Sequence, residues 1–161
     1  QTSSGDDEIL ISTKMGQAVR FMEEKVRSVG RNSMGVKGIT LRVGDSVVSS
    51  EVIKEDNVKI LTVTENGFGK RTEVSKYRLT SRGGKGVTTL KITEKTGQIV
   101  NAFQTGNEDD IVLLSSAGKA TRLKTSDISI IGRATQGVRL MKVGEDIKVV
   151  AVAKITEKEN E

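Results

Sequence analysis

Residues 59–74 read KILTVTENGFGKRTEV, and this stretch decides the fold class. Runs rich in β-branched and apolar side chains at 59–64 and 69–74 flank a turn that contains Asn66-Gly67. An Asn-Gly pair between two such runs is the strongest short-range signal for a β-hairpin. Two further strands are predicted at Gly86–Thr93 and Gln98–Phe103, so that about 50 residues hold four short strands.

The hairpin belongs to a repeat that runs through the chain without gaps. Gly16, Gly67 and Gly118 occupy the same turn, each 51 residues after the one before. A period of this length with four strands per unit predicts the blades of a propeller-like, all-β fold. Apolar and basic positions recur in the same register: Ile9/Ile60/Ile111, Leu10/Leu61/Val112, Val36/Val87/Val138, Arg20/Arg71/Arg122 and Arg31/Arg82/Arg133.

We expect a single domain over residues 1–161, with three four-stranded blades at approximately 8–53, 57–104 and 109–155. Residues 156–161 are acidic and lack apolar side chains, which predicts a disordered tail. Met22–Val29 could form one helical turn, because it contains the helix-favouring Glu23-Glu24-Lys25. The equivalent segments of the other units carry more β-branched or turn residues, so we predict irregular structure there.

The composition narrows the classes of function. The chain has no cysteine and no histidine, which removes the thiol nucleophile, the commonest general base and the usual zinc ligands. We therefore expect no catalytic residue and no metal site in this chain. Its apolar stretches are far shorter than the roughly 20 residues that cross a bilayer, so no membrane is expected as a partner. The absence of an initiator Met predicts a piece of a longer protein.

The charge balance points to an anionic partner. Lys and Arg total 26 against 21 Asp and Glu, which gives a net charge of +5. The aromatic residues are too few to stack unpaired bases, so duplex is favoured over single-stranded nucleic acid. They are Phe21, Phe68, Phe103 and Tyr77, and we interpret Tyr77 as a packing residue.

Three stretches carry a resemblance to a known family: Gly30–Ile39 (GRNSMGVKGI), Asn66–Thr72 (NGFGKRT) and Ile128–Val138 (ISIIGRATQGV). They resemble the C-terminal β-pinwheel of DNA gyrase A and of its paralogue in topoisomerase IV, and the match covers nearly the whole chain. The chain looks like the last three blades of the family's usual six. The resemblance implies a partial, open disc, whose end blade has an exposed edge strand that could pair with a second copy.

Residues 81–86 (SRGGKG) resemble the gyrase box, a Gln-(Arg/Lys)-Arg-Gly-Gly-Lys-Gly heptad that distinguishes gyrase from topoisomerase IV. Thr80 and Ser81 stand where the family has Gln and a basic residue, and the family's box lies on the first blade. We interpret Arg82, Gly83, Gly84, Lys85 and Gly86 as a blade loop with partial box character.

The resemblance implies that the outer rim of the disc binds duplex DNA by its backbone and wraps it. The parent would be a gyrase assembled from two copies each of gyrase A and gyrase B, acting in the bacterial cytoplasm at the nucleoid. The resemblance also implies that this part of the enzyme needs no cofactor and that other parts bind ATP and Mg²⁺. Phosphates are the sequence-independent target, and we predict contacts from Arg20, Arg31, Lys37, Lys70, Arg71, Arg82, Lys85, Arg122, Arg133 and Arg139.

Several alternatives remain open. The Arg20/Arg71/Arg122 set could pair with acids inside each blade rather than with phosphate. The chain could come from topoisomerase IV, or be a protein-interaction propeller, which would expose an apolar patch on one face. A carboxylate-dependent hydrolase would need acids that converge on a central channel.

Overall fold

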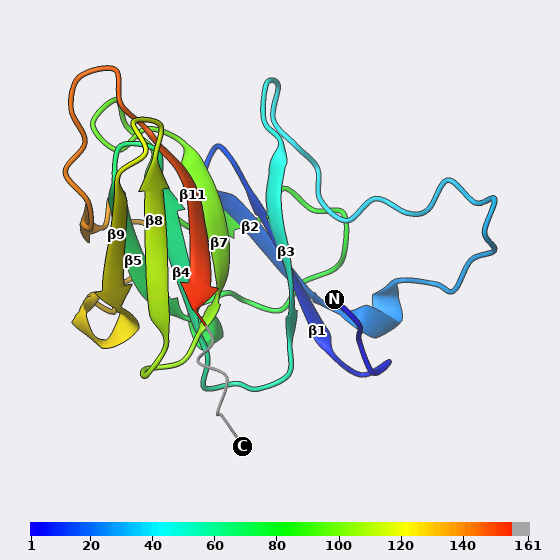
Figure 1. The fold of residues 1–161 in the computed structure, drawn as a ribbon. Coiled ribbons are helices and arrows are strands. Elements are labelled where there is room, and N and C mark those ends of the chain that lie inside the picture. Colours follow the sequence, from blue (N-terminus) through cyan, green and yellow to red (C-terminus); the bar gives the residue numbers. More distant parts are fainter. Residues whose placement is uncertain (156–161) are drawn as a thin grey trace.

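The computed structural model describes residues 1–155, in which the regular structure is β-strand apart from three short 3-10 helices (Figure 1). The predicted tail, 156–161, lies outside the described residues. The first unit contains β1 (Glu8–Thr13), β2 (Gln17–Met22), η1 (Glu23–Lys25) and β3 (Val47–Ile53). The second contains β4 (Lys59–Thr64), β5 (Phe68–Glu73), η2 (Val74–Lys76), β6 (Val87–Thr88) and β7 (Ile99–Thr105). The third contains β8 (Asp110–Ser115), β9 (Ala120–Lys124), η3 (Thr125–Asp127), β10 (Val138–Arg139) and β11 (Val149–Ile155).

The predicted hairpin is confirmed. β4 ends at Thr64 and β5 begins at Phe68, and the two strands are antiparallel with Val63 opposite Gly69. Gly67 adopts φ 78°, a left-handed conformation that glycine tolerates best. Glycine therefore occupies this turn in each unit because the turn demands it.

The three sheets are antiparallel, but one strand of a sheet comes from the next unit. The first sheet has the order β3-β1-β2-β6 and the second β10-β5-β4-β7, so that β6 completes the first unit and β10 the second. The third sheet, β11-β8-β9, has three strands in the described residues. The prediction that each unit supplies all four of its own strands is therefore wrong, although the all-β, propeller-like class is confirmed.

The strand predicted at Gly86–Thr93 is only two residues long, Val87–Thr88. Thr89 follows it and is fully buried, with its hydroxyl 2.6 Å from that of Tyr77. The chain thus turns inward after touching the preceding sheet. One helical turn is present at Glu23–Lys25 and at both equivalent positions, so the prediction of irregular structure there is wrong.

Two apolar layers hold the sheets face to face. The first and second sheets enclose Leu10, Ile60, Val74 and Tyr77. The second and third sheets enclose a larger cluster, whose buried members are Leu61, Val63, Ile111, Leu113, Ile128, Met141, Val149 and Val152. The expected packing role of Tyr77 is confirmed, since it is 1% exposed.

The sheets do not close into a ring. At one edge of the stack, which we call the inner edge, β7 lies against both β3 and β11. The opposite edge carries β6 and β10. Figure 1 shows the segment between η1 and β3 extending away from the body of the first sheet, unlike its counterparts. No helix in residues 1–155 is long and apolar enough to span a membrane.

Candidate nucleic-acid interface

Three equivalent loops run along the outer edge, and we call residues 30–38, 81–89 and 132–140 the outer rim. Each loop is bound to its neighbour by repeated hydrogen bonds. Arg82 Nη1 donates to Lys37 O at 2.7 Å, and Arg133 Nη1 donates to the equivalent Thr88 O at 2.9 Å. Backbone bonds follow the same rule, since Thr40 N donates to Gly84 O at 2.8 Å and Lys91 N to Thr135 O at 2.9 Å. The third loop thus binds the second, and the second binds the two ends of the first, at Lys25 and at residues 37–40, while the middle of the first loop extends away from the stack (Figure 1).

Exposed cations lie along this row of loops. Arg31, Lys37, Lys85 and Arg139 have exposed side chains. The Arg139 guanidinium lies 4.7 Å from the centre of the Phe68 ring, and Lys95 Nζ lies 5.4 Å from it. Phe68 therefore holds two cations at one place by cation–π attraction. An array of cations on adjacent loops suits a polyanion whose charges are regularly spaced.

The box-like loop is fixed to the first unit. Arg82 Nε also donates to Lys25 O at 3.0 Å, and Gly83 N donates to Gly38 O at 2.7 Å. A Cβ at Gly86 would lie 2.3 Å from Ala18 O, so no larger residue fits there. Gly84 and Lys85 remain exposed at the tip. Lys85 is therefore the side chain of this loop best placed for a phosphate, whereas Arg82 and Arg133, both half-buried, also join neighbouring loops.

The structure places Arg20 and Arg71 inside the stack. They are 8% and 3% exposed. Arg20 Nη1 donates to Val74 O and Tyr77 O, at 3.0 and 3.1 Å, and Arg71 Nε donates to Ile128 O at 2.9 Å. Both guanidinium groups thus bind carbonyls of the next unit. Burial lowers the pKa of Arg71. We remove both residues from the proposed DNA contacts, because a buried, bonded guanidinium does not reach a phosphate.

Lys70 is also buried, at 0% exposure. Its ammonium donates to Gly132 O at 2.5 Å, to Arg133 O, and to Thr135 Oγ1 at 3.0 Å. Burial, reinforced by the charge of Arg133, lowers the pKa of Lys70 to about 8. Lys70 therefore supports the rim loop of the third unit from beneath, and we remove it from the proposed DNA contacts as well.

The alternative of acids within each blade holds for two members of the arginine set. Arg20 pairs with Glu8, and Arg122 pairs with the equivalent Asp110. The corresponding residue of the second unit is Lys59, which explains why Arg71 bonds to Asn107 Oδ1, at 3.0 Å, instead of to an acid. Arg122 differs from the other two in that its side chain is 54% exposed.

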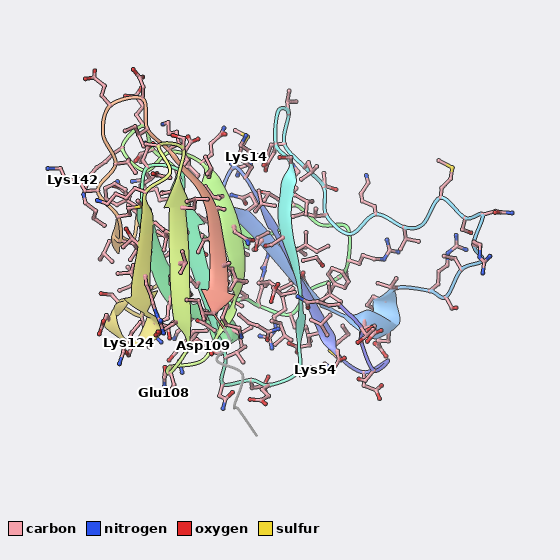
Figure 2. The ribbon with its side chains drawn as sticks, viewed as in Figure 1. Lys14, Lys54, Glu108, Asp109, Lys124 and Lys142 are labelled. Carbon is pink, nitrogen blue, oxygen red and sulfur yellow. The ribbon has the colours of Figure 1, made fainter. Side chains whose placement is uncertain are left out.

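Sequence reasoning missed several exposed cations with a periodic signal of their own. Arg27 and Arg78 are 51 residues apart and follow the 3-10 helices, and Lys91 and Lys142 are likewise 51 apart and follow the rim loops. Figure 2 labels Lys142 in the loop after β10, at the opposite end of the molecule from Lys54 and Glu108. The 51-residue period could have revealed these pairs had it been applied to every Lys and Arg.

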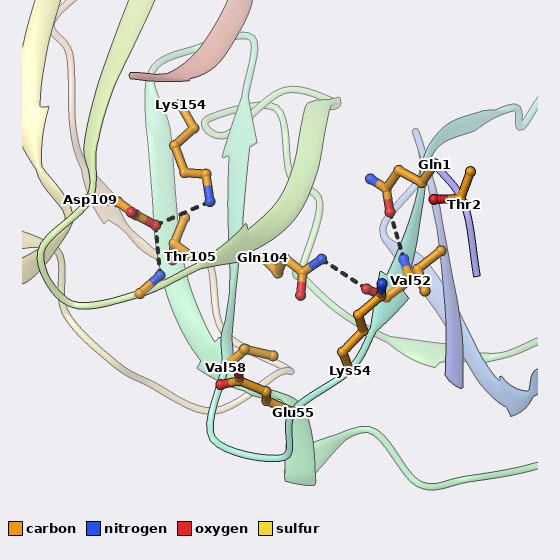
Figure 3. Close-up of a pocket in the computed structure, with 11 residues that line it drawn as sticks. Gln1, Thr2, Val52, Lys54, Glu55, Val58, Gln104, Thr105, Asp109 and Lys154 are labelled. Atoms are coloured by element: carbon orange, nitrogen blue, oxygen red, sulfur yellow. Dashed lines mark hydrogen bonds and ion pairs between the residues drawn. The ribbon is translucent and has the colours of Figure 1, made fainter. Parts of the chain in front are cut away.

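A pocket of about 640 Å³ opens at the inner edge (Figure 3). Gln104 Nε2 donates to Val52 O at 2.9 Å, and Asp109 binds both Gly106 N, at 2.7 Å, and Lys154 Nζ, at 3.4 Å. The Asp109 carboxylate is thus occupied by the turn that precedes it and by Lys154 of its own unit. Within residues 1–155, no three carboxylates gather as a metal site.

Face-packed antiparallel sheets that exchange strands at a fixed period, with a basic outer rim, define a propeller-type repeat domain. The family model described as DNA gyrase C-terminal domain, beta-propeller, matches residues 7–54, 59–105 and 109–156. The chain belongs to this family.

Similar proteins agree with that assignment. The A subunit of DNA gyrase from Staphylococcus aureus (strain MRSA252) is 48% identical over 160 residues, which are 99% of this chain and 18% of that relative. The solved structure of a DNA gyrase A C-terminal domain superposes with TM-score 0.87 at 32% identity, over 96% of this chain and 52% of that one. A topoisomerase IV C-terminal domain superposes with TM-score 0.90 at 26% identity, over 96% of this chain and 48% of that one.

Proposed function

We propose that this domain binds duplex DNA along its outer rim, without sequence preference, and bends it. The observation that carries the proposal is the row of equivalent loops, held side by side by Arg82 and Arg133, with exposed cations on each loop. Such a row contacts phosphates along a curved path. The rim offers no aromatic platform for unpaired bases, because Phe68 is buried beneath its two cations.

The parent protein in this proposal is the gyrase A protein of a DNA gyrase, and the domain biases strand passage toward negative supercoiling by wrapping DNA. The 48% identity to a gyrase A protein supports gyrase over topoisomerase IV. The rest of gyrase A, its partner gyrase B, ATP and Mg²⁺ would act elsewhere in the assembly, in the cytoplasm at the nucleoid.

Salt titration of DNA binding tests the rim. The double variant Lys85→Ala/Arg139→Ala removes two exposed rim cations, and Lys54→Ala/Lys154→Ala removes the same charge from the inner edge. Each phosphate contact contributes about −0.9 to the slope of log affinity against log salt. We expect the rim variant to flatten the slope by about two units, equally on two unrelated duplexes. Equal effects of the two double variants, or loss on one duplex only, would contradict the proposal.

A further inference from the structure

We propose that Phe68 is a positioning residue for DNA binding, because its ring gathers Lys95 and Arg139 into one phosphate contact on the rim side of the stack. The inference rests on the proposed function and adds to it a residue that touches no phosphate itself. Phe68 begins β5 and lies opposite Arg139 of β10. Lys95 reaches the same ring from the turn before β7. Three segments far apart in the sequence thus meet at one aromatic side chain.

The Phe68 ring holds two charges that no carboxylate neutralises. The guanidinium carbon of Arg139 lies 4.7 Å from the ring centre, and Lys95 Nζ lies 5.4 Å from it. Within residues 1–155, neither of these side chains has an ion pair or a hydrogen bond. Both cations are exposed, whereas the ring is 6% exposed. Like charges repel when they are brought together, and the electron-rich face of the ring offsets that repulsion.

A cation held by an aromatic ring keeps its hydrogen-bond donors. Cation–π attraction acts on the charge and does not consume N–H groups, so Arg139 can still offer its guanidinium fork to a phosphate. Arg82 and Arg133 differ, because each donates to carbonyl oxygens of a neighbouring unit. The ring also restricts two long side chains before DNA arrives, which lowers the entropy lost on binding. Phe68 therefore prepares both donors for a phosphate.

A hollow of about 310 Å³ opens beside the ring and is lined by Phe68, Lys95 and Arg139. Its other charged lining residues lie in the loop before β11, and they are Glu145, Asp146 and Lys148. Lys148 Nζ already donates to Asn66 Oδ1 at 2.6 Å. The cations that are not engaged elsewhere are therefore the two on the ring. Because two carboxylates offset part of the positive charge, the hollow suits a single phosphate group beside the ring.

The repeat shows that the strand pairing at this position does not require an aromatic residue. One period earlier the equivalent of Phe68 is Gln17, which is also buried and lies opposite Thr88. The equivalent of Lys95 is Gly44, which has no side chain. The junction of the first and second units therefore forms the same pairing without a ring and without cations. The ring and its two cations occur together where the second unit meets the third, and packing alone does not account for them.

A double-mutant cycle for DNA binding tests the role of Phe68. Phe68→Leu keeps an apolar side chain and both charges, whereas Lys95→Ala/Arg139→Ala removes the charges and keeps the ring. The affinity for a labelled duplex is measured by anisotropy at fixed salt. We expect Phe68→Leu to weaken binding by about three- to tenfold in the wild-type background, and by less than about twofold once both cations are absent. An equal loss in both backgrounds would show that the ring acts through packing, and would overturn the proposal.

Phe103→Leu is the matched control, because it makes the same substitution at a ring over which no cation of residues 1–155 lies. Phe103 belongs to β7, at the inner edge. We expect this variant to bind DNA like the wild type. Circular dichroism and melting curves establish that each variant is folded.

Lys95→Ala gives a second measurement that leaves Phe68 in place. Lys95 lies outside the three rim loops, so a rim of independent cations predicts little effect from its removal. The proposal predicts a loss of affinity comparable with that of Arg139→Ala, and a salt slope flatter by about one unit. Unchanged DNA binding by Lys95→Ala would overturn the proposal.

Lys37→Ala/Lys85→Ala separates this inference from the proposed function, since both residues are exposed rim cations that do not lie on the Phe68 ring. If this variant flattens the salt slope by about two units while the cycle shows no coupling, DNA binds along the rim without the help of Phe68. If neither experiment shows an effect, the proposed function fails together with the inference.

Discussion

At the residue scale, the turn glycines Gly67 and Gly118 share a backbone conformation but have different neighbours. Comparing substitutions at the two sites measures the free-energy cost of a close backbone contact. Gly67 and Gly118 both have φ 78°. Alanine in this conformation costs about 1–2 kcal/mol at either site. At Gly67 the new Cβ would also lie 2.0 Å from Met141 O, whereas at Gly118 it meets nothing within 4 Å.

We therefore expect Gly67→Ala to lower the free energy of unfolding by about 2 kcal/mol or more beyond the loss caused by Gly118→Ala. Denaturant unfolding at concentrations where the chain is monomeric measures both values. Equal losses of unfolding free energy in the two variants would mean that the backbone at Met141 moves away from Gly67 without lowering the stability of the protein.

Lys70 gives a second residue-scale prediction, through pH. Its pKa is lowered to about 8 in the folded protein, mainly by burial, from an ordinary value of 10.5. Between these values the unfolded chain binds the additional proton, so the contribution of Lys70 to stability rises with pH and is lost again as pH falls through about 8. The rise could reach roughly 3 kcal/mol at about 1.4 kcal/mol per pH unit.

The variant Lys70→Met lacks this titration. From pH 7.5 to 9.5 we expect the unfolding free energy of the wild type to rise relative to that of Lys70→Met, measured by denaturant unfolding in matched buffers. Using the difference cancels the titration of other groups, including Tyr77, whose pKa is raised by burial. If the unfolding free energies of the two proteins instead change in parallel with pH, the three acceptors stabilise the Lys70 ammonium in the folded protein as fully as water does in the unfolded chain.

At the element scale, the sequence predicts strands that pair with a neighbour in sequence and misses strands that pair with another unit. The Asn-Gly turn and the alternating runs predict β4 and β5 to within one residue, because a hairpin depends on neighbours in sequence. β6 and β10 are two residues each, and their partners belong to another unit. Periodicity cannot reveal such an exchange, since a strand within each unit gives the same pattern.

The same limit applies to the basic residues of the site. A repeated arginine is equally compatible with a rim and with a bond to the next unit, and Arg71 lies in a strand with a neighbour on each side. One local signal was available for Lys70, whose counterpart in the first unit is the buried Val19. The exposed rim cations were predictable because they lie beside turn glycines, where the chain bends at the surface.

At the scale of the whole molecule, the rim is the surface to which all three units contribute exposed cations. It lies along the outer edge of the stack, on the side of β6 and β10.

This geometry predicts that binding and bending of DNA separate in one titration. Bending about 20–30 base pairs by 40–90° costs on the order of 1–6 kcal/mol, and three units offer few exposed cations to offset that cost. We expect the chain to bind a duplex of this length before it bends it. Anisotropy of a labelled duplex reports binding, and energy transfer between dyes at its two ends reports bending. The bending curve should lie at higher protein concentration and disappear first as salt is added. Curves that coincide at every salt concentration would show that one chain wraps DNA by itself.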